Sequence, residues 1–476
     1  MAGLHKGWRL AALLIVIGAG AGGLIWQQVG GVAGLISSRQ QQNDALIAEK
    51  MAHSVGVLAY LYGYPLVDMA RQQHNDTHIT SADQKVYAPL NRFYLYPEIV
   101  GPDNDGDLRA PNNDTLYFSA WYDVSREPVI LHTPDTSGRY YTVAVTNRYA
   151  EVEHIGRSTT GTEEGYFALV SPDWQGELPA GVRRVVSETP SGWLLGRLLV
   201  EGDADFDAAM GLLQQFWLSE LSQFRRGQPA ASPAPQHAPA MANEDSLEFF
   251  AVMNRELKRL PPRAGERALL AQFDQIGVGP NSDFSEDKLS AAQRRGLLSA
   301  LEDGRAIVEA STQRTIPDYN GWMISSEIGR YGANYMQRAA VVRGGYGNLP
   351  EESLYPARVF DDNGQLLNGG NRYRLHFAAD QMPPVDGFWS LSLYRLSDLQ
   401  LEENAIARYS IGDRTPGLHY GDDGSLTLLL QHDSPSGDSN WLPTPAGPFL
   451  AVMRLYEPRQ EVLKNDYLLP IIERLD

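Results

Sequence analysis

Short runs of β-branched and aromatic residues, separated by Gly, Pro, Asp and Asn turns, limit the folds that this chain can adopt. Such spacing is typical of antiparallel sandwiches and barrels rather than of units in which strands alternate with helices. Near the C-terminus, Tyr373, Leu375 and Phe377 alternate with polar residues, which predicts a sheet with one buried face. The N-terminal runs cover residues 86–96, 116–124, 128–132, 140–146, 165–171 and 182–187.

Helical periodicity precedes and separates these two groups of strands. An amphipathic helix is predicted to start at Asp44 and to be kinked at Pro65. Ser290, with Gln293 three residues later, forms the pattern of a capping box, which predicts the start of a helix. The helices predicted between the two groups of strands cover about residues 245–259, 264–276 and 290–311.

We therefore predict a mainly β fold with a helical insert (α+β). It has two antiparallel β-sandwich-like domains joined by a helical segment and preceded by an N-terminal transmembrane or signal helix. The predicted boundaries are 1–43 for a signal anchor or signal peptide, 44–80 for an N-terminal helical segment, 81–202 for the first sandwich-like domain, 203–348 for a helical segment with a Pro/Ala-rich linker at 227–243, and 349–476 for the C-terminal sandwich-like domain.

The N-terminus carries two cations followed by a long apolar segment. Lys6 and Arg9 precede an uncharged run from Leu10 to Trp26, which resumes from Val29 to Ile36. Cations before the run place the N-terminus in the cytoplasm, so we predict an inner-membrane, single-pass protein with its body in the periplasm. The alternative is secretion to the periplasm after signal cleavage, because Ala19 to Ala21 match a signal-peptidase site.

Composition excludes several classes of function. The formal net charge of -18, without a basic run, argues against a nucleic-acid partner. The chain has no Cys, so it forms no disulfide, thiolate nucleophile or Cys-ligated metal site. No HExxH or GxSxG motif occurs, and we predict no metal and no cofactor. The acidic stretch Asp103 to Asp107 resembles a calcium loop, but a solvated acidic loop is favoured because no Glu closes it.

Candidate functional residues gather between Asp386 and Pro443, where loops carry Arg, Asp, His and Trp. General acid–base chemistry needs two carboxylates in unlike environments, and aromatic rings stack on sugars or other flat ligands. The candidates for catalysis are Asp386, Asp413, His432 and Asp433. The candidates for ligand binding are Asn113, Asp114, Tyr117, Trp389, Arg408, Tyr409, Arg414 and Trp441.

Each candidate also has a structural interpretation. Asp413 is expected to pair with Arg408 or Arg414 and to hold its loop together, or else to act in catalysis. The strand alternation places Trp389 in the core, whereas Trp441 lies in a Pro-rich loop and is the better ligand candidate. His432 and Asp433 are expected to stabilise a hairpin rim through hydrogen bonds.

Several motifs carry a family resemblance. In the N-terminal half these are residues 111–117, 135–141, 159–162 and 193–197, and in the C-terminal half residues 370–373, 375–377, 383–390, 408–415, 431–433 and 440–449. They resemble the bacterial family that pairs Domain of Unknown Function 1254 with Domain of Unknown Function 1214. The resemblance covers about residues 85–200 and 350–460. It implies two β-sandwich-like domains with helices between them, and no assigned reaction.

Two hypotheses about function follow. In the first, a membrane-anchored, periplasm-facing protein binds a glycan, an envelope component or another small ligand between its two sandwich domains. In the second, it is a carboxylate-dependent hydrolase or lyase acting on a carbohydrate-like substrate. The sequence leaves open where the loop at Asn113 and Asp114 lies relative to residues 408–414, and a shared cleft would make these residues one site. The sequence leaves a homodimer open.

Overall fold

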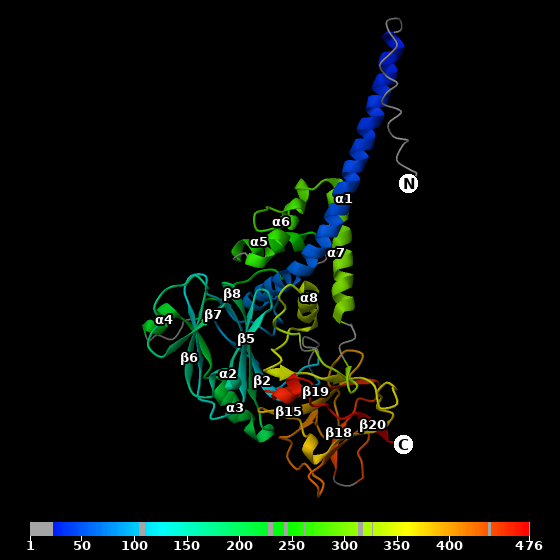
Figure 1. Cartoon of the computed structure of the whole chain (residues 1–476). Coiled ribbons are helices and arrows are strands. Elements are labelled where there is room, and N and C mark those ends of the chain that lie inside the picture. Colours follow the sequence, from blue (N-terminus) through cyan, green and yellow to red (C-terminus); the bar gives the residue numbers. More distant parts are fainter. Residues whose placement is uncertain are drawn as a thin grey trace.

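The computed structural model describes residues 22–103, 110–226, 232–241, 246–260, 263–312, 318–325, 327–436 and 439–475, with side chains described from Ile36 onward except at residues 264 and 318. The fold is mixed α and β, with a long N-terminal helix and several antiparallel sheets (Figure 1). The coarser part of the predicted fold class is therefore confirmed. The sandwich arrangement and the domain boundaries stay predictions.

The N-terminal helix α1 extends from Gly22 to Thr77 and projects well beyond the rest of the molecule (Figure 1). Within the part of the chain that the structure describes, no helix combines the length and the apolar character needed to cross a membrane. The prediction of a single-pass inner-membrane anchor is therefore wrong for these residues, because Gln27 and Gln28 interrupt the apolar run and residues 37–44 are polar. Residues 1–21, with Lys6, Arg9 and the first part of the predicted anchor or signal, lie outside the described residues.

The helices between the two groups of strands pack around the C-terminal half of α1. Helix α7 runs beside α1 (Figure 1) because glycines allow close approach, and a Cβ built on Gly296 would lie 2.3 Å from the carbonyl oxygen of Glu49. The described part of the predicted linker, residues 232–241, is largely exposed. The α-helices here are α5 (Glu248–Arg259), α6 (Arg267–Phe273), α7 (Ala291–Thr312) and α8 (Tyr335–Gly344), with short 3-10 helices at 264–266, 274–276 and 286–288. Two further 3-10 helices, 203–205 and 379–381, lie within the β regions.

The first β region, residues 94–220, contains two sheets that share one hydrophobic core. One sheet has the order β1 (Tyr94–Leu95), β2 (Thr115–Asp123), β8 (Ser191–Leu199), β4 (Tyr141–Asn147), β5 (Val152–Gly156). The other has the order β7 (Val182–Val186), β6 (Gly165–Val170), β3 (Val129–Thr133), β9 (Trp217–Glu220). The short helices here are α2 (Arg157–Thr160), α3 (Phe206–Leu213) and α4 (Leu221–Arg225). Phe118 on β2 and Phe167 on β6 are both buried in the shared core.

The second β region, residues 318–475, repeats this arrangement with different strands. One sheet has the order β10 (Asp318–Tyr319), β11 (Trp322–Met323), β13 (Ala357–Arg358), β19 (Phe449–Tyr456), β15 (Trp389–Arg395), β16 (Ser410–Gly412), with β12 (Ser353–Leu354) also paired to β19. The other has the order β18 (Asn440–Pro443), β17 (Leu426–Gln431), β14 (Arg372–Phe377), β20 (Ile472–Leu475), and helix α9 covers Gln460–Leu463. Leu375 on β14 and Leu391 on β15 meet in one core, as their alternation predicted.

Candidate functional site

Asp114, in the loop before β2, joins the two β regions. Its side chain is only 7% exposed. Oδ2 accepts a hydrogen bond from Ser390 Oγ on β15 at 2.6 Å, and Oδ1 lies 3.2 Å from Arg414 Nη2 and 3.4 Å from Ser410 Oγ. A loop of the first region and the residues around β16 therefore form one constellation, although nearly 300 positions separate them in sequence.

Asp413 lies beside this contact, but few groups compensate the charge of its carboxylate. Its Oδ1 accepts a bond from the backbone N–H of Trp389 at 3.3 Å and lies 3.7 Å from Arg414 Nε. The side chain is 33% exposed. Desolvation still raises the pKa of Asp413 to about 6, although Arg414 and the Trp389 N–H lower it. Arg414 is directed instead to Asp114, and its guanidinium carbon lies 3.9 Å from the centre of the Phe388 ring.

Next to Asp114, two arginines and four tyrosines form what we call the junction cluster: Tyr117, Arg197, Tyr355, Tyr394, Arg454 and Tyr456. Arg197 donates from Nη1 to Tyr355 Oη at 2.5 Å and lies 5.5 Å from the ring centre of Tyr117. Arg454 donates from Nη2 to the carbonyl oxygen of Ala110 at 2.7 Å and to Tyr394 Oη at 2.8 Å. The first β region supplies Tyr117 and Arg197, and the second supplies the other four.

Several donors of the junction cluster lack an acceptor. Arg454 is 3% exposed, yet its Nε and Nη1 have no hydrogen-bond partner among the described residues, and neither has Arg197 Nε or the buried hydroxyl of Tyr456. No described carboxylate forms an ion pair with Arg197 or Arg454. A buried donor without an acceptor costs about 1–3 kcal/mol, and more when it is charged. Because Arg197 and Tyr355 are only half-buried, the cluster extends from the interior toward the surface.

The structure brings some of the predicted site residues to this junction. Asp114, Asp413 and Arg414 meet there, and Tyr117 belongs to the junction cluster. The Oδ1 of Asn113 is buried without a partner among the described residues. Two aromatic residues lie close by without entering the cluster, because Trp389 packs in the core 5.4 Å from Phe377 and Tyr409 packs near Tyr394.

The other predicted site residues lie apart from Asp114. Arg408 donates to the carbonyl oxygen of Trp441 at 2.8 Å, and Trp441 is buried with its Nε1 bonded to the backbone of Gln431. His432 and Asp433 are exposed, and His432 Nδ1 lies 2.9 Å from the carbonyl oxygen of Thr444. Asp386 is exposed and pairs with Arg459 at 2.7 Å. Their roles stay predictions.

The two arginines of the junction cluster, Arg197 and Arg454, were not among the site residues predicted from the sequence. Arg454 is the single charged residue in the apolar strand β19, and Arg197 is the single charged residue in β8. A lone cation inside an apolar strand is a signal that could have found both, since a charge is rarely buried without a partner.

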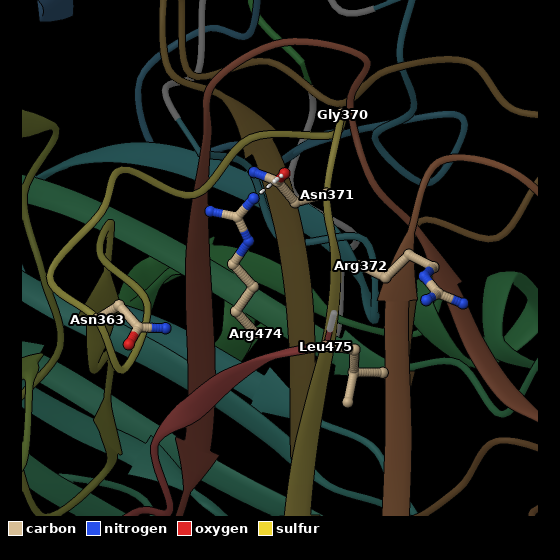
Figure 2. A pocket seen from close by; sticks show the side chains of 6 residues that line it. All are labelled: Asn363, Gly370, Asn371, Arg372, Arg474 and Leu475. Atoms are coloured by element: carbon tan, nitrogen blue, oxygen red, sulfur yellow. Dashed lines mark hydrogen bonds between the residues drawn. The ribbon is translucent and has the colours of Figure 1, made fainter.

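Two other places in the chain bear on ligand binding. Within the described residues there is no group of three or more His, Asp or Glu side chains that could hold a metal, and residues 104–109 of the acidic loop lie outside the description. A hollow of about 360 Å³ lies at the edge of β14 and β20. Figure 2 shows the residues that line it, among which Arg474 donates to Asn371 Oδ1. The hollow is lined by Asn363, Gly370, Asn371, Arg372, Arg474 and Leu475, none of which was predicted as a site residue.

Comparison with known proteins places the junction between two recognised domains. Residues 90–220 match the model described as "Protein of unknown function (DUF1254)", and residues 352–460 match "Protein of unknown function (DUF1214)". The crystal structure of the VPA0106 protein from Vibrio parahaemolyticus is 26% identical, covers 89% of this chain and 100% of its own, and has a TM-score of 0.68. A putative uncharacterized protein from Burkholderia cenocepacia is 13% identical over 93% of this chain and 99% of its own, and its TM-score of 0.42 is too low to support an argument.

No curated protein matches the sequence. The order of the two matched domains along the chain, DUF1254 and then DUF1214, is the order that the sequence motifs predicted. The chain therefore belongs to the family of proteins in which a DUF1254 domain is followed by a DUF1214 domain.

Proposed function

We propose that this protein binds a small organic anion, such as a sugar acid, at the junction cluster between its DUF1254 and DUF1214 domains. The observation that carries the proposal is Arg454, which is 3% exposed and keeps two guanidinium nitrogens without an acceptor among the described residues. Ligand sites occur preferentially at domain interfaces, which is where this arginine lies.

The chemistry of the junction cluster favours an anion over a neutral ligand. Arg197 and Arg454 present donors, and a guanidinium matches the two oxygens of a carboxylate. Tyr355, the half-buried tyrosine of the cluster, adds an aromatic ring that suits a sugar or another ring. Asp114, the nearby carboxylate, is already occupied by Arg414 and Ser390, so it leaves the positive charge of the two arginines in excess.

Paired probes that differ only in their acid group test the proposal. We expect D-glucuronate to bind and to raise the melting temperature, and D-glucose to do neither, when both are measured by calorimetry and thermal melting. Arg454→Met should weaken glucuronate binding by at least about tenfold, the loss expected when a charge-assisted hydrogen bond is removed. Arg454→Lys keeps the charge but not the planar fork, so it should bind with intermediate affinity.

Two control variants make the result specific. Arg338→Met removes another buried arginine, which belongs to the helical segment and not to the junction. Its guanidinium carbon lies 5.0 Å from the Tyr335 ring centre. Like Arg454, Arg338 has an Nε and an Nη1 without partners among the described residues. Arg474→Met removes a cation from the hollow of Figure 2. Both controls should bind glucuronate like the unaltered protein. Equal binding by Arg454→Met, or no preference for glucuronate over glucose, would contradict the proposal.

A second candidate function is acid–base catalysis on a carbohydrate-like ligand bound at the same junction. It is favoured by two neighbouring carboxyl groups in unlike environments, since Asp114 pairs with Arg414 whereas burial raises the pKa of Asp413 to about 6. A lyase would release unsaturated uronate, which ultraviolet absorbance detects. Polyuronate should then yield this product with the unaltered protein and not with Asp413→Asn, and no unsaturated product with either would exclude a lyase.

A further inference from the structure

Two buried glutamates face each other on the surface that the DUF1214 domain presents to the DUF1254 domain. Ser353 pairs with Tyr456 across β12 and β19, and the ladder continues with the N–H of Glu457 bonded to the carbonyl oxygen of Glu352 at 2.8 Å. Glu352 is 2% exposed and Glu457 is 6% exposed. Two carboxylates at neighbouring cross-strand positions destabilise each other when both are ionised.

The DUF1254 domain supplies the donors for both carboxyl groups. Tyr140 Oη donates to Glu352 Oε1 at 2.6 Å and Ser158 Oγ donates to Glu352 Oε2 at 2.9 Å. Arg157 Nη1 lies 3.3 Å from Glu457 Oε2, and Arg157 Nη2 donates to the carbonyl oxygen of Asp386 at 2.7 Å. The two glutamates are therefore part of the contact that holds the two domains together.

Glu457 is the member of the pair with fewer hydrogen bonds to its carboxyl group. Its Oε1 is buried without a partner among the described residues, and its φ of 51° lies in the left-handed region that non-glycine residues seldom adopt. Burial raises the pKa of Glu457 to about 7 and outweighs the opposing charge of Arg157, and the charges of Glu352 and Asp386 add smaller contributions in the same direction as burial. Burial also raises the pKa of Glu352, against hydrogen bonds from Tyr140, Ser158 and Thr142 and the charge of Arg197.

We propose that Glu352 and Glu457 form a proton-operated latch between the DUF1254 and DUF1214 domains, which holds them more firmly when the pair carries a proton than when both carboxylates are ionised. The groups that face the pair are Arg157, Tyr140, Ser158, Thr142 and Arg197 of the DUF1254 domain, and Asp386 of the DUF1214 domain. Because one proton removes the repulsion between two buried charges, its loss weakens the contact.

The direction of the pH dependence follows from linkage. The pKa of Glu457 is about 7 in the folded protein and 4.5 in its ordinary state, so between these values the folded chain holds a proton that the unfolded chain has lost. The stabilisation is complete below the lower value and is lost as the pH rises through about 7. The latch therefore tightens on mild acidification.

Melting temperatures measured from about pH 5 to about pH 8.5 test the latch. All variants carry Asp413→Asn, because Asp413 also titrates in this range. We expect the melting temperature to fall as the pH rises through about 7, and Glu457→Gln to abolish this fall. Arg157→Met removes the charge that lowers the pKa of Glu457, so the fall should move to higher pH. Glu351→Gln, an exposed neighbour that pairs with Arg330, is the control and should change nothing.

Hydrogen exchange of the intact chain measures how firmly the two domains are held together at this contact. After correction for intrinsic rates, backbone amides near Arg157 and Glu352 should exchange faster above pH 7 than below it, and Glu457→Gln should remove the difference. An unchanged pH slope in Glu457→Gln overturns the proposal. If Glu457→Gln does not fold, the proposal is overturned when Arg157→Met leaves the pH at which the melting temperature falls unchanged.

Discussion

Arg414 follows Asp413 directly in the sequence, yet it donates a hydrogen bond to Asp114 in the other domain. The sequence predicted that Asp413 accepts bonds from Arg408, Arg414 or backbone N–H groups. Of these, the Trp389 N–H at 3.3 Å is the bond that forms, while Arg414 Nε stays at 3.7 Å and Arg408 donates to Trp441. Arg414 forms a hydrogen bond with Asp114 at 3.2 Å, so its ion pair with Asp413 is the longer of the two.

The first prediction concerns Asp413→Asn. Because burial raises the pKa of Asp413 from 3.8 to about 6, the stability that this group contributes is full below the lower value and is lost as the pH rises to about 6. Asn removes the charge, so we expect the variant to be at least as stable as the unaltered protein near pH 8, and its advantage to be smaller near pH 5. Thermal melting at both pH values checks this, and a large loss of stability at pH 8 would show that Asp413 is instead a needed partner of Arg414.

At the scale of elements, helix α1 depends on α7 for its position. Three glycines lie along the contact between them: a Cβ on Gly56 would lie 2.8 Å from Ala300 Cβ, one on Gly296 would lie 2.3 Å from the carbonyl oxygen of Glu49, and one on Gly304 would lie 2.6 Å from the Tyr60 ring. Such distances are shorter than ordinary contacts, so the two helices pack with their backbones close together. The N-terminal half of α1 projects beyond this contact (Figure 1).

The second prediction is that Gly296→Ala lowers stability even though alanine favours helices. Overpacking against Glu49 should lower the free energy of unfolding by about 1–3 kcal/mol, and the higher helix propensity of alanine should raise it by up to about 1 kcal/mol. The matched control is Gly211→Ala in α3, where a Cβ would meet nothing within 4 Å. Chemical denaturation should show a loss for Gly296→Ala and no loss for Gly211→Ala. Equal results would mean that α1 and α7 separate easily.

At the scale of the whole molecule, polar contacts hold the DUF1254 and DUF1214 domains together. Asp114 receives bonds from Ser390 and Arg414, Glu352 receives bonds from Tyr140 and Ser158, and the rings of Tyr140, Phe388 and Tyr456 pack together between these two contacts. Both proposed features, the anion site and the latch, use residues of this interface. We therefore expect the two domains to unfold together.

The third prediction tests the coupling of the domains through Asp114→Ala. Removing one partner of a buried ion pair should cost roughly 3 kcal/mol, because Arg414 is left without its carboxylate. Arg414→Met should cost a similar amount, and the double variant should cost less than the sum of the two. Calorimetry should also show the single transition broaden or split. Additive losses would indicate that the two side chains do not interact across the interface.

Local patterns predicted much of the fold. Tyr373, Leu375 and Phe377 alternate on β14 and are buried, as their period of two required. Ser290 and Gln293 form the predicted capping box, with bonds of 3.0 and 3.2 Å, at the start of α7. Helix α1 continues through Pro65 to Thr77, where it packs against the helices beside it.

The sequence by itself determined which segments become strands and helices, since hydrophobic periodicity and capping act over a few residues. It also placed Asp114, Asp413 and Arg414 among the candidates for the site. Only the tertiary structure decided that Arg197 and Arg454 both lie against Tyr355 and that Glu352 bonds to Glu457 through their backbones, because these residues lie far apart in the chain. The environment of a buried charge depends on which strands pair and which domains touch, and local sequence carries no record of either.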